Sequence, residues 1–308
     1  MATPQAPQYI GRRLPVPPGR RHALVRFLDE RDPTGGRAKA ALFLLHPGPS
    51  LLVTAVTVGA AGIALRAMPS PSLALRLVLL MLPAQFAIGV ANDLADLRAD
   101  REGKPHKPLV RGAVPSAAAW AITLTAIAVS LASAASLGTA VLGATLAGLG
   151  AGLAYDAGLK RGLLSWVPWW AGFTALPFCA FAAAGRFPVA LWWSVPLTAV
   201  LAVALHCANA LPDIADDRRA GVRSLPVLLG ASRARVFAIA GLAICAAATA
   251  ALVAPLHLRG AWLPAAWGVT LLSVAAVVAS PRLVRAPFPL LAVASAVLAV
   301  AWLAALPV

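Results

Sequence analysis

Residues 91–101 read ANDLADLRADR, and a second copy of this pattern, ANALPDIADDR, stands at residues 208–218. The copies share an Asn-Asp-Asp triplet at i, i+4 and i+8, namely Asn92, Asp96 and Asp100 in the first and Asn209, Asp213 and Asp217 in the second. Residues four apart lie on one face of a helix, so each triplet is expected to form a column of oxygen ligands. Asp93 and Asp216 add one more carboxylate to each copy.

Carboxylates stacked at this spacing repel each other and destabilise an isolated helix by a few tenths of a kcal/mol per pair. An arrangement that is unfavourable by itself indicates a cation that neutralises it. Oxygen ligands suit Mg²⁺, which binds few carboxylates directly and completes its shell with water and substrate phosphates. We therefore expect the two columns to face each other across one cavity and to bind Mg²⁺ together with a diphosphate.

The rest of the chain is typical of a membrane protein. Hydrophobic residues make up 60% and the mean hydropathy is +0.80, whereas soluble domains have roughly 45–50% apolar residues. A transmembrane helix needs about 20 mostly apolar residues. Such runs occur at 49–66, 72–91, 115–135, 138–155, 163–184, 189–210, 233–254, 261–280 and 287–306. The sequence thus predicts an all-α integral membrane protein, a nine-transmembrane-helix bundle with a central cavity. Residues 41–308 would form this domain and residues 1–40 a flexible, basic, Pro- and Arg-rich tail.

The positive charges predict the orientation. All but four of the 26 Lys and Arg fall on the side that would hold the amino terminus; the exceptions are Arg66, Arg76, Arg186 and Arg259. The positive-inside rule places that side in the cytoplasm, with both Asp-rich copies and the cavity opening. The net charge of +15 is then largely a topology signal, and basic residues scattered among membrane loops do not indicate nucleic-acid binding.

Basic residues accompany both copies, and a third junction, residues 155–161, lies between them in sequence. Cations close to Asp columns are expected if the ligand, such as a diphosphate, carries more negative charge than the metal offsets. Topology alone also explains each single Lys or Arg. The substrate-binding candidates in these segments are Asn92, Asn209, Lys104, Lys107, Arg161, Arg218 and Arg223.

Several other side chains have two interpretations. Gln85 and His206 lie seven residues before Asn92 and Asp213 and would contact either substrate or another helix. Trp166, Trp169 and Trp170 would either stabilise a cation or form an interfacial belt. Cys179, Cys207 and Cys245 stand singly in apolar runs, which argues against a metal-thiolate site or a disulfide.

Both Asp-rich segments resemble motifs of a known family. The pattern Asn92-Asp93-x-x-Asp96-x-x-x-Asp100 resembles the first Asp-rich motif of the UbiA superfamily of intramembrane prenyltransferases. Asp213-x-x-x-Asp217, followed by RRAGVRSLPVLLG, is similar to the second, and KPLVRG at 107–112 is similar to the sequence after the first. The resemblance covers residues 41–308 and implies nine helices with both motifs cytoplasmic.

The resemblance also implies roles for individual residues. The implied catalytic residues are Asp96, Asp100, Asp213, Asp217 and Lys160, and the implied metal ligands are Asn92, Asp93, Asp96, Asp100, Asp213, Asp216 and Asp217, with a less direct role for Asp93 and Asp216. The family's Tyr-x-x-x-Lys motif binds diphosphate, which implies that Tyr155 also binds substrate. The motif appears here one residue longer, from Tyr155 to Lys160. The helix would therefore need a break, which we expect at Gly158, and Arg161 is an alternative diphosphate ligand.

The implied activity is Mg²⁺-dependent transfer of an isoprenyl group from an isoprenyl diphosphate to an aromatic or lipid acceptor through an allylic cation. The expected setting is the lipid bilayer of a bacterial cell membrane, with no obligate protein partner. A terpene cyclase on the same fold is an alternative that the sequence does not separate from a transferase. A transporter is a third hypothesis, but transporters bind their substrates near the bilayer midplane, whereas the carboxylates here lie at helix ends.

Overall fold

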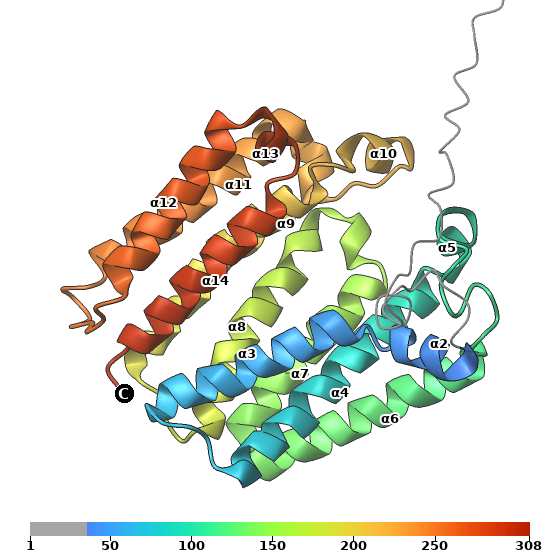
Figure 1. Ribbon diagram of the computed structural model, residues 1–308, viewed down its shortest axis with the longest axis horizontal. Coiled ribbons are helices and arrows are strands. Elements are labelled where there is room, and N and C mark those ends of the chain that lie inside the picture. The colour runs from blue at the N-terminus through green and yellow to red at the C-terminus, as the bar shows by residue number, and fades with distance from the viewer. Residues whose placement is uncertain (1–35) are drawn as a thin grey trace, which may run out of the picture.

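The computed structural model describes residues 36–308, and within this range it contains helices and no strand (Figure 1). The prediction of an all-helical protein is confirmed. Most of the expected tail, including Asp29, lies outside the described residues. The proposed domain boundary at residue 40 falls within α2 (Gly36–Leu44).

Each of the nine predicted apolar runs overlaps one long helix of the described range. These helices are α3 (Pro47–Leu65), α4 (Pro71–Ala95), α6 (Ser116–Leu137), α7 (Thr139–Asp156), α8 (Val167–Ala183), α9 (Ser194–Ala210), α11 (Leu225–Ala251), α12 (Leu263–Ala279) and α14 (Phe288–Ala305). Six candidate spans, those that contain α3, α4, α6, α9, α11 and α14, are long and apolar enough to cross a membrane. The chain is therefore an integral membrane protein, and the count of nine spans stays a prediction.

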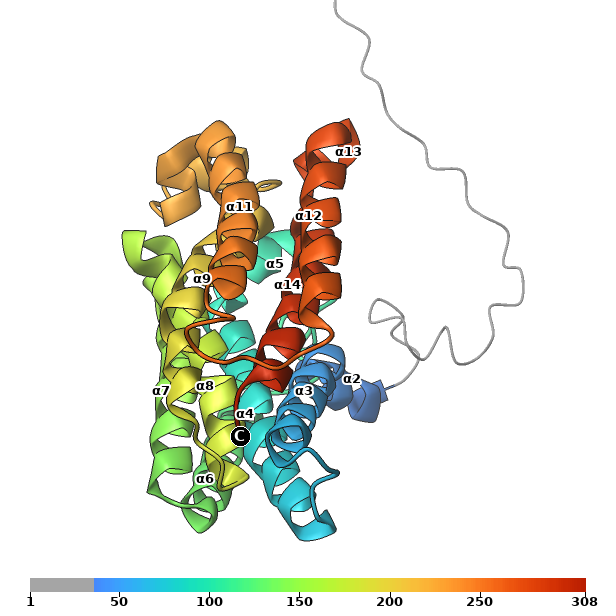
Figure 2. The same cartoon turned by 90° about the vertical axis from the view of Figure 1, so that its left-hand side faces the viewer.

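The long helices form a closed ring in chain order. Each helix contacts the next one along the chain, and α14 returns to α3 (Figures 1 and 2). In addition, α8 contacts α3, which is not its neighbour along the chain. This arrangement brings segments that are far apart in sequence to the same end of the bundle.

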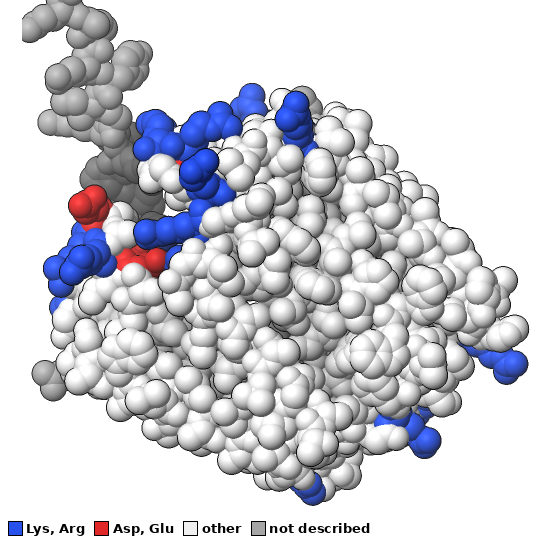
Figure 3. All heavy atoms as spheres, turned by 180° about the vertical axis from the view of Figure 1, so that it is seen from behind, with Lys and Arg blue, Asp and Glu red and all other residues white. Residues whose placement is uncertain are grey.

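Short helices connect the long ones at the end where the Asp-rich copies lie. They are α5 (Leu97–Gly103), η2 (Leu159–Arg161), η3 (Leu163–Trp166), α10 (Ile214–Arg219) and α13 (Pro281–Arg285). On the face seen in Figure 3, the acidic side chains and most of the basic ones gather at one end, and only scattered basic side chains lie at the opposite end. On this face the charged side chains are therefore concentrated at one end of the bundle.

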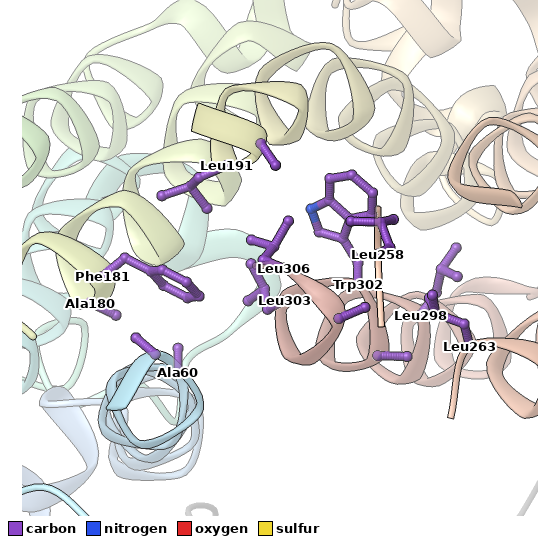
Figure 4. Close-up of a cluster of buried hydrophobic side chains, with 14 of the residues drawn as sticks. Ala60, Ala180, Phe181, Leu191, Leu258, Leu263, Leu298, Trp302, Leu303 and Leu306 are labelled. Carbon is purple, nitrogen blue, oxygen red and sulfur yellow. The ribbon is translucent and has the colours of Figure 1, made fainter. Parts of the chain in front are cut away.

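The interior is packed with small and branched apolar side chains. The largest cluster joins α3, α8, α14 and η4 (Val189–Trp193) around Phe181, Leu191 and Trp302 (Figure 4). The indole N–H of Trp302 donates to Ser194 Oγ at 3.0 Å, which satisfies a buried polar group. A Cβ added at Gly241 would lie 2.6 Å from Ala204 Cβ, so α9 and α11 approach too closely for a larger residue.

Candidate active site

The first Asp-rich copy does not lie on one unbroken helix. Asp96 separates α4 from α5, with φ −89° and ψ 1°. The N–H of Asp96 nevertheless bonds to the Asn92 carbonyl at 2.9 Å, and the N–H of Asp100 bonds to the Asp96 carbonyl at 2.8 Å. The i, i+4, i+8 register predicted for this copy is therefore kept through the break.

The second copy departs further from the predicted column. Here α9 ends at Ala210 and α10 begins at Ile214, and the N–H of Asp213 bonds to the Ala210 carbonyl instead of Asn209. Pro212 has no N–H with which to continue the helical ladder. The expectation that Asn209 and Asp213 share the face of one helix is therefore wrong. The pair Asp213 and Asp217 keeps its i, i+4 hydrogen bond, at 2.9 Å.

A buried ion-pair network fixes one side of the first copy. Lys107 Nζ lies 2.7 Å from Asp93 Oδ1 and 2.6 Å from Asp100 Oδ2. These carboxylates are seven residues apart, nearly two helical turns, and therefore share a face. They are only 2% and 5% exposed. His46 Nε2 lies 3.3 Å from the other Asp93 oxygen, and Lys104 Nζ lies 3.4 Å from Asp100.

The ammonium group of Lys107 is held in its charged form. Burial lowers the pKa of Lys107, but hydrogen bonds to Asp100 and Asp93 outweigh this effect, so the pKa lies above its usual value. Lys107 was predicted to bind substrate. In the structure it neutralises two carboxylates of the first copy, which leaves it little capacity for another ligand.

Lys160 neutralises the other side of the same copy. Its Nζ lies 2.7 Å from both Asp96 carboxylate oxygens and 3.2 Å from Asn92 Oδ1. The chain reaches this position because α7 ends at Asp156 and Gly158 takes φ 143°, a conformation that favours glycine. The break in the longer Tyr–Lys spacing thus falls at the residue where it was expected.

Arg161 and Arg223 connect the third junction to the second copy. The side chains of both residues are exposed, and the Arg223 N–H bonds to the Arg161 carbonyl at 2.9 Å. Arg218 instead donates through its guanidinium to the Val227 carbonyl at 2.9 Å, which ties α10 to α11.

The second copy keeps more of its negative charge than the first. Asp216 forms an exposed ion pair with Arg219. Within residues 36–308, neither Asp213 nor Asp217 forms an ion pair. Burial raises the pKa of Asp217, and the neighbouring carboxylates of Asp213 and Asp216 raise it further. This cluster would be stabilised by a cation.

The third junction lies between the two copies. Its Lys160 donates to Asp96 of the first copy, and its Arg161 carbonyl accepts from the N–H of Arg223, which follows the second copy. Asp156 of the same junction is only 7% exposed, and its Oδ2 has no hydrogen-bond partner. The sequence interpretation missed Asp156, although an acidic residue beside Tyr155 in a basic junction was a visible signal.

An apolar cavity of about 610 Å³ extends from this junction into the bundle. Its walls come from α3, α4, α7 and α8, with Phe288 of α14. Tyr155 and Trp169 line the end next to the Asp-rich copies. Thr145 and Cys179 line the far end, where Leu80 and Cys179 also belong to a buried apolar cluster.

The structure shows which of the polar and aromatic side chains with two interpretations line the cavity. Gln85 lines the cavity, whereas His206 Nε2 shares a hydrogen bond of 2.8 Å with Ser165 Oγ between segments of the bundle. Trp169 lines the cavity and makes an edge contact with Phe288. Trp166 and Trp170 stack on each other, and neither lines the cavity.

Mg²⁺ prefers oxygen ligands, and the two copies and the third junction supply them. In the part of the chain that the structure describes, no group of three or more His, Cys, Asp or Glu side chains is arranged to hold a metal. Mg²⁺ needs only one or two carboxylates together with phosphate and water. Asp213 and Asp217 offer two carboxylates without ion pairs, and Asp156 Oδ2 is a buried acceptor without a partner. These residues therefore fit the ion.

Comparisons with known proteins agree with this fold. Residues 51–296 match the model of the UbiA prenyltransferase family. A digeranylgeranylglyceryl phosphate synthase structure has a TM-score of 0.71 at 16% identity, covering 87% of this chain and 98% of that one. A UbiA homologue from Archaeoglobus fulgidus, bound to GPP and Mg²⁺, has a TM-score of 0.65 at 21% identity and coverages of 84% and 99%. An apo UbiA homologue from Aeropyrum pernix K1 has a TM-score of 0.60 at 25% identity and coverages of 82% and 96%. No curated protein sequence gives a significant match.

Proposed function

The chain belongs to the UbiA prenyltransferase family, and from this membership we propose that it transfers an isoprenyl group from a diphosphate donor to an aromatic or lipid acceptor in a Mg²⁺-dependent reaction. The observation that carries the proposal is an apolar cavity of about 610 Å³ that begins beside two Asp-rich motifs. Structures of the A. fulgidus homologue with GPP or DMAPP and Mg²⁺ support this class of donor.

Each motif would have a defined part in the reaction. Asn92 and Asp96 of the first motif and Asp213 and Asp217 of the second would hold Mg²⁺. When bound, Mg²⁺ would stabilise the negative charge that develops on the leaving diphosphate. Lys104, Asn209, Arg161 and Arg223 lie at the same end of the bundle and would contact the phosphates.

The cavity would control the fate of the isoprenyl group. As the allylic C–O bond breaks, its electron pair leaves with the diphosphate and the allylic carbon becomes cationic. The ring face of Trp169 would stabilise this cation, and the apolar walls would exclude water. A nucleophilic atom of the acceptor then bonds to the allylic carbon, and the acceptor loses a proton. The buried ion pairs of Asp93 and Asp100 with Lys107 would hold Asn92 and Asp96 in position.

The proposal includes an orientation. Residues 41–308 would form the membrane domain with nine spans, and residues 1–40 would form a cytoplasmic tail. The concentration of basic side chains at the end that carries the motifs supports an opening toward the cytoplasm (Figure 3). In a bacterial cell membrane, the donor diphosphate would then enter from the cytoplasm.

Sealed membrane vesicles of both orientations test the reaction and the side of the membrane from which the donor enters. A labelled isoprenyl diphosphate does not cross a bilayer, so product is expected in inside-out vesicles and not in right-side-out ones. Formation should require Mg²⁺ and one member of a panel of phenols, quinols and lipid alcohols. Product formed without any acceptor would support the terpene-cyclase alternative, and activity restricted to right-side-out vesicles would contradict the orientation.

The depth of the cavity supports a donor with about three isoprene units. Tyr155 and Ala144 line opposite ends of the α7 wall, and their separation corresponds to about 16 Å of helix at about 1.5 Å per residue. An extended chain gains about 1.2 Å per bond, so an isoprene unit with four bonds along the chain spans about 5 Å. A C15 tail would therefore extend to the far end of the cavity near Thr145.

Gly172→Phe is expected to shift the donor preference toward shorter chains. Gly172 lines the cavity, and a Cβ added there meets no atom within 4 Å, so the new ring would occupy open cavity space. We expect turnover of the C15 donor to fall about 10-fold or more relative to a C10 donor, because a filled pocket rejects added methylenes. Competition between labelled donors measures the ratio.

Gly143→Phe is the matched control for this substitution. Gly143 also has no atom within 4 Å of an added Cβ, but it is exposed and does not line the cavity. An unchanged C15 to C10 ratio in Gly172→Phe, or an equal shift in Gly143→Phe, would contradict the assignment of the cavity to the donor tail.

A further inference from the structure

The two Asp-rich motifs carry different charge before any metal binds. Lys107 and Lys160 together contact three carboxylates of the first motif, Asp93, Asp96 and Asp100. No comparable cation within residues 36–308 pairs with Asp213 or Asp217. Two motifs with matching sequence spacing are therefore not equivalent as cation sites.

Lys160 contacts the oxygen atoms of the first motif that a metal would use. Its ammonium group lies 2.7 Å from both carboxylate oxygens of Asp96 and 3.2 Å from Asn92 Oδ1. An ammonium is a compact point charge with three donors, and here all three of these acceptor contacts belong to the first motif. A divalent cation would gain these oxygens only if Lys160 moved away.

Lys160 is better placed to move than Lys107. Its side chain is 17% exposed, and it stands on the short helix η2 directly after Gly158. The side chain of Lys107 is 10% exposed, and its two partners are almost fully buried. A bound diphosphate would offer Lys160 several charged oxygens in exchange for those of Asp96 and Asn92.

We propose that Lys160 keeps the first motif closed to metal until a diphosphate binds, so that cations load in a fixed order. The second motif binds the first cation by itself. The first motif binds a cation only when the diphosphate takes over the ammonium group of Lys160. This inference rests on the proposed Mg²⁺- and diphosphate-dependent function and adds an order of binding to it.

Binding of Mn²⁺ to the purified full chain in detergent tests this order without any turnover. Electron paramagnetic resonance measures free Mn²⁺, and inorganic pyrophosphate stands in for the donor. The wild type is expected to bind one Mn²⁺ tightly by itself and a second after pyrophosphate is added. Asp217→Asn should lose the first ion. Lys160→Met should bind two ions without pyrophosphate, with at least about a 10-fold gain in affinity for the second.

Arg98→Met is the matched control, because it removes an exposed positive charge from α5 beside the first motif. It should bind Mn²⁺ as the wild type does, and size-exclusion chromatography verifies that each variant is folded. Two ions bound by the wild type without pyrophosphate, or one bound by Lys160→Met, would overturn the inference and leave the proposed function standing. A wild type that binds no Mn²⁺ even with pyrophosphate would contradict the proposed function itself.

Discussion

Asp96→Ala and Asp213→Ala are each expected to reduce isoprenyl transfer by about 100-fold or more, since losing one preorganised contact to the developing charge commonly has an effect of that size. The two residues come from different motifs, and both would hold the metal that stabilises the leaving diphosphate. The measurement is kcat with saturating donor and acceptor. An excess of chelator should abolish the activity of the wild type, and Mg²⁺ or Mn²⁺ should restore it.

Two controls separate this effect from a general loss of negative charge. Glu102→Ala removes an exposed carboxylate from α5 without touching the first motif's contacts. Asp29→Ala removes one from the segment outside the described residues. Both variants should keep wild-type activity. Full activity of Asp96→Ala or Asp213→Ala, or of the wild type in excess chelator, would exclude the metal–diphosphate mechanism.

Lys107→Met is expected to lower the free energy of unfolding by about 3–5 kcal/mol, the usual effect of removing one partner from a buried ion pair. The variant leaves Asp93 and Asp100 buried without the ammonium group that now lies within 2.7 Å of each. Chemical unfolding in detergent, followed by circular dichroism, measures the change.

Lys104→Met is the comparison for this stability effect. Lys104 also pairs with Asp100, but its side chain is 56% exposed, so its loss should change the free energy by less than about 1 kcal/mol. Adding Asp93→Asn and Asp100→Asn to Lys107→Met should recover much of the lost stability. If Lys107→Met and Lys104→Met have equal effects, the buried network is not what stabilises the first motif.

Much of the fold could be predicted from composition and spacing. A stretch of about 20 apolar residues in a membrane protein forms a helix, because no other local structure satisfies its backbone within lipid. Each predicted run therefore became a helix of the described range. Gly158 could be identified as the break in the third junction, since only a residue that tolerates positive φ allows Lys160 to turn back toward the first motif.

The candidate site could be predicted as a set of residues but not as a set of contacts. The spacing of Asn92, Asp96 and Asp100 indicated which side chains share a helix face. It did not show that Lys107 would bind Asp93 and Asp100, or that Lys160 would bind Asp96. Those partners come from other segments of the chain, and the packing of the helix ends decides which of the nearby cations reaches which carboxylate.

The sequence by itself therefore determined the helices, the membrane setting and the repeated Asp motifs, because these follow from local composition and periodicity. Only the tertiary structure decided that Asp156 is buried without a partner for Oδ2 and that Trp169 lines the cavity. It also decided that the two motifs differ in charge. These features depend on which groups the closed helix ring brings together and removes from water, and that is not encoded in the spacing of any single segment.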